Sequence, residues 1–394
     1  MFDLRVYSKR LVAALLLALS FSFFSGRASA ATPPLCSDIT ATPSDLGSGG
    51  SAILVMGGQD GKAYYQMRPW LAPATSWVAL FGGQALFPPC TTFAVATTGS
   101  NVDVFGIGSN GLMFTAYMSG GAWSWGSMNN GTFIPGAAVA AVERNIGRRQ
   151  IDVFAIGTDG RVWTTWWNNG WSAWGPIGTQ TFTQTNPILA LPHGTSAHSD
   201  NLSQLDLYIV GSNNQVFTTY YDWYSPGWHN WGALASVGLT GGRISATARI
   251  YDIGNWASHN YAVQLDLFGV DQSHTARTTW WNNGWYNGGW GSFSGITMAS
   301  GTGIAAAVTL PPSSSNTTVE NLLLYTVDSS GFLRSTNWQP NQGWSSWSFF
   351  PNNTRVTNPI NNSVKLFAGE VYVYNGNKLS IAIPATGQLL SLVN

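Results

Sequence analysis

Short apolar runs alternate with polar turn residues along most of this chain. Residues 137–178 contain four such runs, at 137–143, 152–157, 161–167 and 171–178. Asp-Gly and Asn-Gly pairs separate the last three runs, and both pairs are strong hairpin signals because they tolerate positive φ. The runs are rich in Val, Ile, Phe, Trp and Thr, as half-buried strands require. Past residue 30 no stretch has an apolar period of 3.6 residues, so the pattern predicts antiparallel strands and an all-β chain.

The same four-strand pattern recurs along the chain. The segments 103–125, 152–174, 206–231 and 266–290 share one phrase, and self-similarity at a period of 40–60 residues indicates a repeat architecture. The units are 38–83, 91–135, 137–179, 186–236, 242–297, 303–350 and 364–394. Four-stranded sheets repeated radially predict a single β-propeller domain over 31–394, with seven blades. We expect the last blade to be incomplete, because the seventh unit stops before a Trp-x-x-Trp fourth strand.

The first thirty residues have the pattern of a signal peptide. Three basic residues precede an apolar stretch, 11–24, that is too short to span a bilayer, and an Ala-Ser-Ala cleavage signal ends at Ala30. No later run of about 18 apolar residues is present, so no membrane insertion is expected. The sequence therefore predicts export, to the periplasm or the extracellular space, after cleavage near Ala30.

Charge is scarce throughout the chain. Only 9% of residues are charged, where about 25% is ordinary. Without a basic excess, nucleic acid is not an expected partner. A surface built from Asn, Ser, Thr, Gly and Gln suits a neutral polar ligand, although low charge is equally typical of extracellular β proteins in general.

The two cysteines, Cys36 and Cys90, are expected to form a disulfide. Paired cysteines in an exported chain are usually bridged. Each stands three residues before an apolar residue, Ile39 or Phe93, at matching positions of two consecutive units. The bridge would then join the first blade to the second. Two cysteines and five scattered histidines give no metal-binding spacing, and no cofactor motif is present.

Aromatic residues beside Asn-rich turns are the candidate ligand-binding residues. Sugars lay their C–H face on aromatic rings while amides bond their hydroxyls, and Trp with Asn supplies both functions. The candidates are Trp166, Asn168, Asn169 and Trp171 in the third unit, Trp280, Asn282, Asn283 and Trp285 in the fifth, and, more weakly, Tyr221, Trp228 and Trp231 in the fourth. For any single Trp, burial between blades is the competing interpretation, because adjacent strand residues point to opposite faces of a sheet.

Aspartates open the second run of four units but do not predict catalysis. Asp103, Asp152, Asp206 and Asp266 recur once per unit, so a propeller would spread them around a ring. Glycosidases need two carboxylates facing one bond. The pattern favours a structural role in capping turns.

The phrase at 152–174 follows D-V-F-x-x-G-x-D-G-x-x-W-x-x-W-W-x-x-G-W-x-x-W. It resembles the PLL-type bacterial seven-bladed β-propeller lectins, and the resemblance extends loosely over 38–394. It implies carbohydrate binding at several weak sites between adjacent blades, with fucose-like or methylated sugars among the ligands, no enzymatic activity, and homo-oligomers. The Arg-Glu-Trp set of the six-bladed fungal-type fucose lectins has no counterpart, because the chain has only Glu143, Glu320 and Glu370. Units one, six and seven lack parts of the motif, so fewer sites than blades are expected.

Two other functions remain open at this stage. A protein-binding or adhesion scaffold would use the long loops at 193–203 and 251–261. A propeller glycoside hydrolase is the other alternative. A sialidase in particular needs an arginine triad, and the arginines here show no matching pattern in the sequence.

Overall fold

In the computed structural model, the described residues belong to one compact unit, 33–394. They are 35, 37, 40–44, 51–69, 75–98, 101–128, 131–145, 149–183, 186–193, 204–222, 226–252, 261–282, 284–309, 321–339, 342–350, 355, 363–367, 370–374, 378–383 and 388–393. The expected signal peptide, 1–30, lies outside them. No helix among them is long and apolar enough to cross a membrane.

The strands of the described residues form seven antiparallel sheets, numbered here in chain order. Sheet 1 contains β1 (Thr40–Ser44), β2 (Ser51–Gly57), β3 (Ala63–Pro69) and β4 (Val78–Ala79), and the short 3-10 helix η1 (Phe81–Gly83) follows it. Sheet 2 contains β5 (Ala94–Thr98), β6 (Asn101–Ile107), β7 (Met113–Ser119) and β8 (Ala122–Met128). Sheet 3 contains β9 (Val139–Asn145), β10 (Arg149–Ile156), β11 (Arg161–Trp167) and β12 (Gly175–Thr181). Sheet 4 contains β13 (Ile188–His193), β14 (Gln204–Val210), β15 (Val216–Asp222), β16 (Gly227–Trp228) and β17 (Gly232–Ala233).

The remaining sheets continue the same order. Sheet 5 contains β18 (Leu239–Asp252), β19 (Tyr261–Asp271), β20 (Ala276–Trp281) and β21 (Gly291–Ser292). Sheet 6 contains β22 (Ala305–Thr309), β23 (Asn321–Val327), β24 (Leu333–Gln339), β25 (Gly343–Trp344) and β26 (Ser348–Phe349). Sheet 7 contains β27 (Ser363–Phe367), β28 (Glu370–Tyr374), β29 (Lys378–Ile383) and β30 (Gln388–Val393). The prediction of an all-β chain is confirmed.

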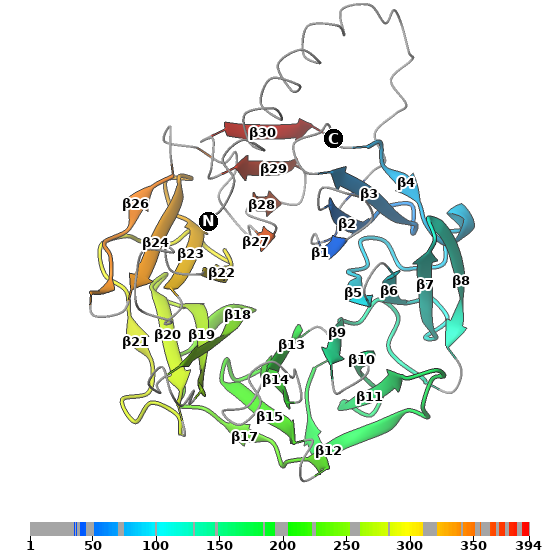
Figure 1. Ribbon diagram of the computed structural model, residues 1–394, viewed down its shortest axis with the longest axis horizontal. Coiled ribbons are helices and arrows are strands. Elements are labelled where there is room, and N and C mark those ends of the chain that lie inside the picture. The colour runs from blue at the N-terminus through cyan, green and yellow to red at the C-terminus, as the bar shows by residue number, and fades with distance from the viewer. Residues whose placement is uncertain are drawn as a thin grey trace, which may run out of the picture. The chain divides into compact units, whose positions relative to one another are not determined.

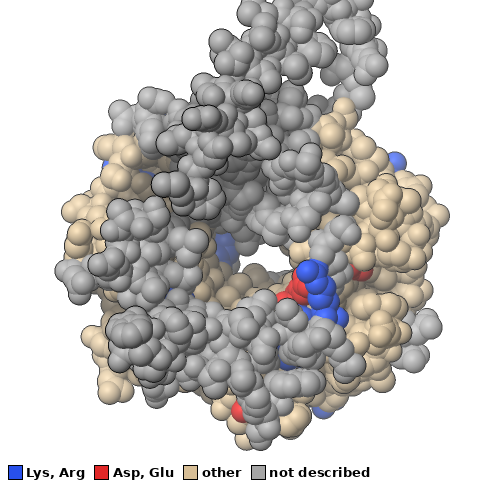
Figure 2. All heavy atoms as spheres, in the orientation of Figure 1, with Lys and Arg blue, Asp and Glu red and all other residues tan. Residues whose placement is uncertain are grey.

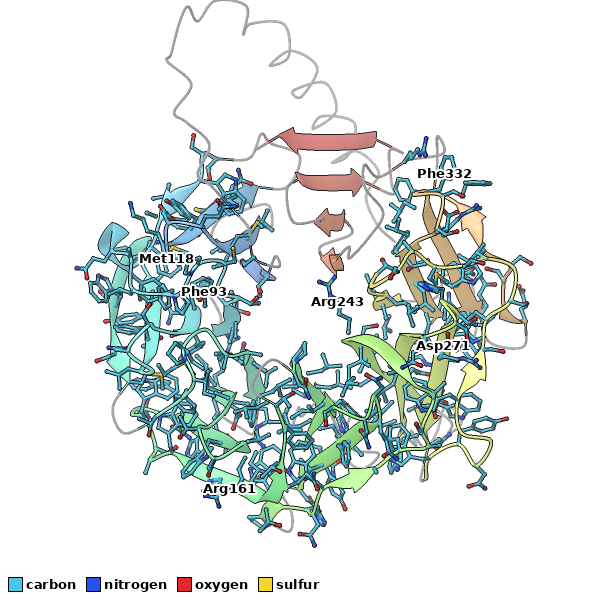
Figure 3. The ribbon with its side chains drawn as sticks, turned by 180° about the vertical axis from the view of Figure 1, so that it is seen from behind. Phe93, Met118, Arg161, Arg243, Asp271 and Phe332 are labelled. Carbon is cyan, nitrogen blue, oxygen red and sulfur yellow. The ribbon has the colours of Figure 1, made fainter. Side chains whose placement is uncertain are left out.

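The first strands of the sheets meet in a ring (Figure 1). Each contacts the first strand of the next sheet, from β1 through β5, β9, β13, β18, β22 and β27, and β27 contacts β1 in turn. Four-stranded sheets arranged radially in this way make a β-propeller. Small side chains suit the crowded inner strands: Ala94, Ala138, Ala140 and Ala190 line a central cavity of about 530 Å³. Arg243 also lines this cavity and lies toward the centre of the ring (Figure 3).

The core lies between neighbouring sheets rather than inside any one of them. Val153 and Phe154 are adjacent on β10 and both have 0% exposure. Val153 packs with residues of sheet 2, whereas Phe154 packs with residues of sheet 4. Because sheet 3 is buried on both faces, β10 is almost continuously apolar between Ile151 and Ile156, apart from Asp152. The described surface carries few charged groups, as Figure 2 shows for one face.

Two expectations from the sequence, about the last unit and about a long loop in the fifth unit, were wrong. The last unit is not incomplete, because sheet 7 has four strands of its own. Its first two strands, β27 and β28, pair with each other. The loop expected at 251–261 is also shorter than expected, because the pairing of β18 with β19 extends to Asp252 and Tyr261.

The expected Cys36–Cys90 disulfide stays a prediction, because Cys36 lies outside the described residues. Most residues of the two loops assigned to protein binding, 194–203 and 253–260, also lie outside the described residues.

Candidate functional site

Four sheets place an aspartate of the second strand directly opposite an aromatic residue of the third. The pairs are Asp103 with Tyr117, Asp152 with Trp166, Asp206 with Tyr220, and Asp266 with Trp280. All four aspartates are strand residues, so the interpretation that they cap turns was wrong. Turn capping is done by other aspartates, such as Asp271, whose carboxylate accepts hydrogen bonds from the backbone N–H groups of Ser273 and Thr275.

In three sheets the aspartate is paired with a basic residue from the first strand. The Arg144 Nε and Nη2 atoms donate to Asp152 at 2.7 and 2.9 Å. Arg249 holds Asp266 in the same two-bond arrangement, at 2.8 and 3.1 Å. In sheet 4 the equivalent residue is His193, whose Nε2 contacts the Asp206 carboxylate.

A glutamine completes the group on the same second strand. Gln150 Nε2 donates to Asp152 at 3.0 Å, and Gln264 Nε2 donates to Asp266 at 2.9 Å. Gln204 has the same position in sheet 4, opposite His193. Each carboxylate is therefore held by donors that fix its orientation, and a buried charge needs such partners.

The arginines also reach across to the next sheet. The Arg144 guanidinium lies 4.8 Å from the ring centroid of Tyr221, and that of Arg249 lies 4.1 Å from Trp338. These are cation–π distances. Arg249 and Asp266 are 3% exposed each, and burial raises the pKa of Asp266 while Arg249 opposes the rise. The ion pair thus joins two sheets at the place where a ligand would enter.

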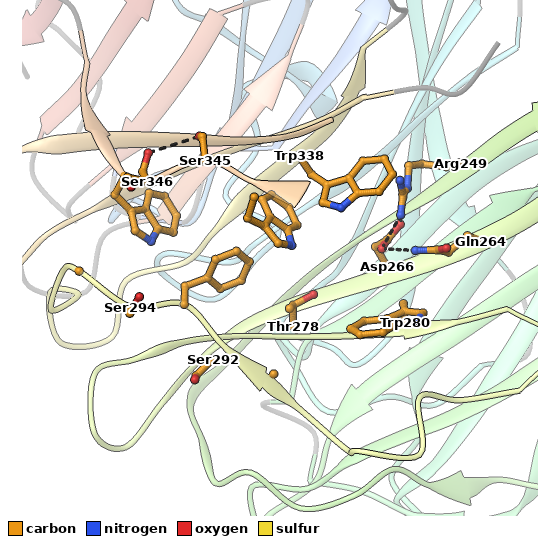
Figure 4. Close-up of a pocket in the computed structure, with 15 residues that line it drawn as sticks. Arg249, Gln264, Asp266, Thr278, Trp280, Ser292, Ser294, Trp338, Ser345 and Ser346 are labelled. Carbon is orange, nitrogen blue, oxygen red and sulfur yellow. Dashed lines mark hydrogen bonds and ion pairs between the residues drawn. The ribbon is translucent and has the colours of Figure 1, made fainter. Parts of the chain in front are cut away.

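A cavity of about 740 Å³ opens between sheets 5 and 6 beside this group (Figure 4). Its wall combines the rings of Trp280, Trp338 and Trp344 with the polar groups of Arg249, Gln264, Asp266, Thr278, Ser292, Ser294, Ser345 and Ser346. Aromatic faces and hydrogen-bonding groups therefore converge on one space.

An equivalent and smaller cavity, of about 370 Å³, lies between sheets 4 and 5. Sheet 4 contributes His193, Gln204, Asp206 and Tyr220, and sheet 5 contributes Trp281 and Trp285. The residue types and their positions repeat those of the larger cavity, with histidine in place of arginine.

The two cavities divide one aromatic pair between them. Trp280 lines the cavity between sheets 5 and 6, and its neighbour Trp281 lines the cavity between sheets 4 and 5. Successive residues of a strand point to opposite faces, as expected from the sequence. The Trp280–Trp281 pair therefore lines two neighbouring cavities.

The structure places the predicted Trp residues in different surroundings. Trp166 is 43% exposed and lies opposite Asp152, while Trp280 and Trp285 line the cavities just described. Trp171 and Trp228 are half-buried and pack edge-on against the preceding sheet.

Trp231 and Tyr221, the weaker candidates, also take part in packing. The Trp231 indole N–H donates to the Ile177 carbonyl at 3.0 Å, which favours a packing role. Tyr221 carries Arg144 over its ring.

Three of the predicted asparagines, Asn168, Asn169 and Asn282, lie at bends after the third strand of their sheets. Asn169 has φ +57° and an exposed side chain, and Asn168 donates its backbone N–H to the Gly170 carbonyl. Asn282 makes the same bond to Gly284, whereas Asn283 lies outside the described residues. Neither Asn168, Asn169 nor Asn282 lines the two cavities.

Sequence reasoning missed the basic residues and the glutamines. Arg144, His193 and Arg249 stand at different distances from their aspartates along the chain, because the connections between first and second strands differ in length. Their shared register position, opposite a glutamine, appears only when the strands are paired. A usable signal was present: Gln-x-Asp recurs at 150–152, 204–206 and 264–266.

Comparison with solved structures finds the same fold. The BP39L lectin from Burkholderia pseudomallei matches with a TM-score of 0.68 and 16% identity, over 91% of this chain and 99% of that one. An arginine-to-alanine triple mutant of AofleA from Arthrobotrys oligospora matches with a TM-score of 0.50 and 16% identity, over 77% and 86% of the two chains. A fungal lectin from Aleuria aurantia, described as a six-bladed β-propeller, gives a TM-score of 0.48 at 15% identity, over 82% and 99%.

No family model matches the chain, and no curated protein matches its sequence. At 16% identity, the likeness to BP39L establishes a shared fold.

Proposed function

We propose that this protein is a non-enzymatic carbohydrate-binding protein, a lectin, that holds neutral sugars between neighbouring sheets of the propeller. The observation that carries the proposal is the cavity between sheets 5 and 6, where Trp280, Trp338 and Trp344 face fixed polar groups. The likeness in fold to BP39L, which is described as a lectin, supports the same conclusion.

The chemistry of the cavity fits a sugar. A pyranose ring offers apolar C–H faces to indole rings and hydroxyls to amide, hydroxyl and carboxylate groups. Asp266 is already bound by Arg249 and Gln264, so its carboxylate is oriented before a ligand arrives. Such preorganisation lowers the cost of binding. Fucose-like and methylated sugars are the first ligands to test, because their methyl groups add apolar contact with the rings.

The same arrangement argues against hydrolysis at this cavity. Glycosidase chemistry takes two carboxylates facing one bond. Among the described residues, Asp266 is the single carboxylate that lines the cavity, and it forms an ion pair with Arg249. In this proposal, Asp266 holds the wall of the cavity in place through its bonds to Arg249.

We infer a seven-bladed propeller of the PLL type with several sites. Seven sheets among the described strands, closed by contact between β27 and β1, support this blade number. Repetition of the acidic group in sheets 3, 4 and 5 supports at least three sites. Multivalent binding then raises the avidity for clustered glycans above the affinity of one site. Export and homo-oligomer formation belong to the same proposal.

The disulfide is also part of this proposal, and the contacts of neighbouring residues support it. Ser37, which follows Cys36, accepts a hydrogen bond on its Oγ from the Gly57 N–H at 2.6 Å, and Leu35 bridges to Gly58. The Cys90 N–H donates to the Gly58 carbonyl at 3.1 Å. The flanks of Cys36 and Cys90 itself thus meet at one turn.

A glycan array with the mature chain tests the proposed function. We expect binding to a defined set of neutral glycans, and a reduced signal for the double variant Trp280→Ala/Trp338→Ala. Trp125→Ala is the matched control, because Trp125 is 39% exposed and does not line the cavity. An empty array, or equal loss of signal in the control, contradicts the proposal.

A further inference from the structure

The interface between sheets 2 and 3 packs like those between sheets 3 and 4, 4 and 5, and 5 and 6. It differs in the charged groups around its aspartate, Asp103. At each interface an aromatic residue of a second strand meets a Trp of the following sheet edge-on. The centroid distances and interplanar angles are 5.7 Å and 90° for Phe105–Trp171, 5.6 Å and 88° for Phe154–Trp228, 6.2 Å and 86° for Tyr208–Trp285, and 5.9 Å and 87° for Phe268–Trp344. The surroundings of Asp103 can therefore be compared directly with those of Asp152 and Asp266.

Among the described residues, Asp103 has no basic partner. The register position that Arg144 holds in sheet 3, opposite Gln150, is held in sheet 2 by Thr98, opposite Asn101. Among the residues whose side chains the structure describes, none donates a hydrogen bond to the Asp103 carboxylate. Burial raises the pKa of Asp103 to about 7, as expected for a carboxylate without a counter-charge.

The aromatic side of the interface is nevertheless complete. Trp167 has the register position in sheet 3 that Trp338 has in sheet 6. The Arg249 guanidinium lies 4.1 Å from the centroid of the Trp338 ring. Trp167 is 40% exposed, and Tyr117, opposite Asp103, is 47% exposed. An aromatic face and a carboxylate thus stand where an arginine is bound at two other interfaces, and the described part of the chain places no cation there.

We propose that the interface between sheets 2 and 3 binds the primary ammonium group of a ligand, such as an amino sugar, at the place that an arginine guanidinium fills in sheets 3 and 5. The ammonium pairs with Asp103 and lies over the Trp167 ring, as cations do in aromatic cages. This site goes beyond the proposed neutral-sugar sites, because it selects its ligand by charge.

Titration with glucosamine and with its neutral N-acetyl derivative tests the proposal. We expect glucosamine to shift the Trp167 indole N–H signal in NMR spectra, and Asp103→Asn to weaken this binding at least tenfold. N-acetylglucosamine should bind wild type and Asp103→Asn alike. Methylammonium separates the ammonium from the sugar ring: it should compete with glucosamine at the same signal.

A second variant keeps the test independent of the stability of Asp103→Asn. Thr98→Arg supplies the missing guanidinium, so it should abolish glucosamine binding while the protein stays folded. Asp159→Asn, a carboxylate-to-amide change in a turn of sheet 3, is the matched control and should leave glucosamine binding unchanged. Equal glucosamine binding by wild type, Asp103→Asn and Thr98→Arg overturns the proposal. Neutral-sugar binding at the cavity between sheets 5 and 6 is measured in the same variants, so that failure of one proposal is distinguished from failure of the other.

Discussion

Asp103, Asp152, Asp206 and Asp266 share one register position but meet different partners. Asp152 and Asp266 are each held by an arginine and a glutamine, Asp206 contacts a histidine, and Asp103 has no basic residue at the corresponding place. Equivalent positions in the repeat therefore differ in their charged partners, and we expect this difference to affect both stability and ligand choice.

Asp103 makes stability depend on pH. Its pKa is about 7 in the folded chain and near 4 when unfolded, so the folded state binds the proton more tightly. Stability from this group is complete below about pH 4 and is lost as the pH rises toward 7. We expect Asp103→Asn to remove this part of the pH dependence, measured as the difference in melting temperature between wild type and variant across pH 4–8. A constant difference would contradict the assignment.

Removal of Asp266 should destabilise the fold, because it leaves a buried arginine without a counter-charge. Asp266→Ala leaves the Arg249 guanidinium, 3% exposed, without its partner, and such a loss costs about 3–5 kcal/mol. Urea unfolding measures this change. Removing both charges, in Arg249→Met/Asp266→Leu, should cost less than the single change. Arg149→Ala is the control, because the exposed Arg149–Glu143 pair contributes below about 1 kcal/mol.

At the scale of the strand, β20 links two cavities. β20 sends Trp280 to one cavity and Trp281 to the next. The strand is both the wall between two sites and a part of each.

Single Trp changes on β20 should therefore affect different cavities. Trp280→Ala should weaken sugar binding between sheets 5 and 6, and Trp281→Ala should weaken it between sheets 4 and 5. The indole N–H signals of Trp338 and Trp285 report on the two cavities in an NMR titration. If either change silenced both reporters equally, the division of the pair would be refuted.

The strands and the repeat were predictable from the sequence, whereas the polar group of each site was not. Asp-Gly and Asn-Gly turns fix hairpins locally, so β10 and β11 follow from residues 152–167 alone. The pairing of Arg249 with Asp266 depends on a long hairpin, β18–β19, whose register runs past the predicted boundary. Which Trp lines a cavity and which packs between sheets depends on the neighbouring sheet, and local pattern does not contain that information.

At the scale of the molecule, the ring joins its two ends by contact between β1 and β27. Among the described strands, none is shared between the first and last sheets, because sheets 1 and 7 each contain four strands from their own stretch of chain. The proposed disulfide would reinforce the first sheet of this ring.

Reduction of the proposed disulfide should destabilise the protein. A bridge from Cys36 to Cys90 closes a loop of more than 50 residues, which contributes about 4 kcal/mol by restricting the unfolded chain. We expect no free thiols in the unfolded, unreduced protein, and a lower urea midpoint after reduction. Cys36→Ser/Cys90→Ser should reproduce the reduced midpoint, and two titratable thiols before reduction would disprove the bridge.

Each sheet is built from one contiguous segment of the chain, so a whole sheet can be gained or lost as a unit. A segment that encodes one whole sheet can be duplicated, deleted or exchanged without severing any hydrogen-bonded ladder. Breaks placed in the connections between sheets, with the original ends joined by a short linker, should likewise give circular permutants that refold. Copies freed in this way diverge one at a time, which accounts for arginine, histidine and threonine at equivalent places in a single molecule.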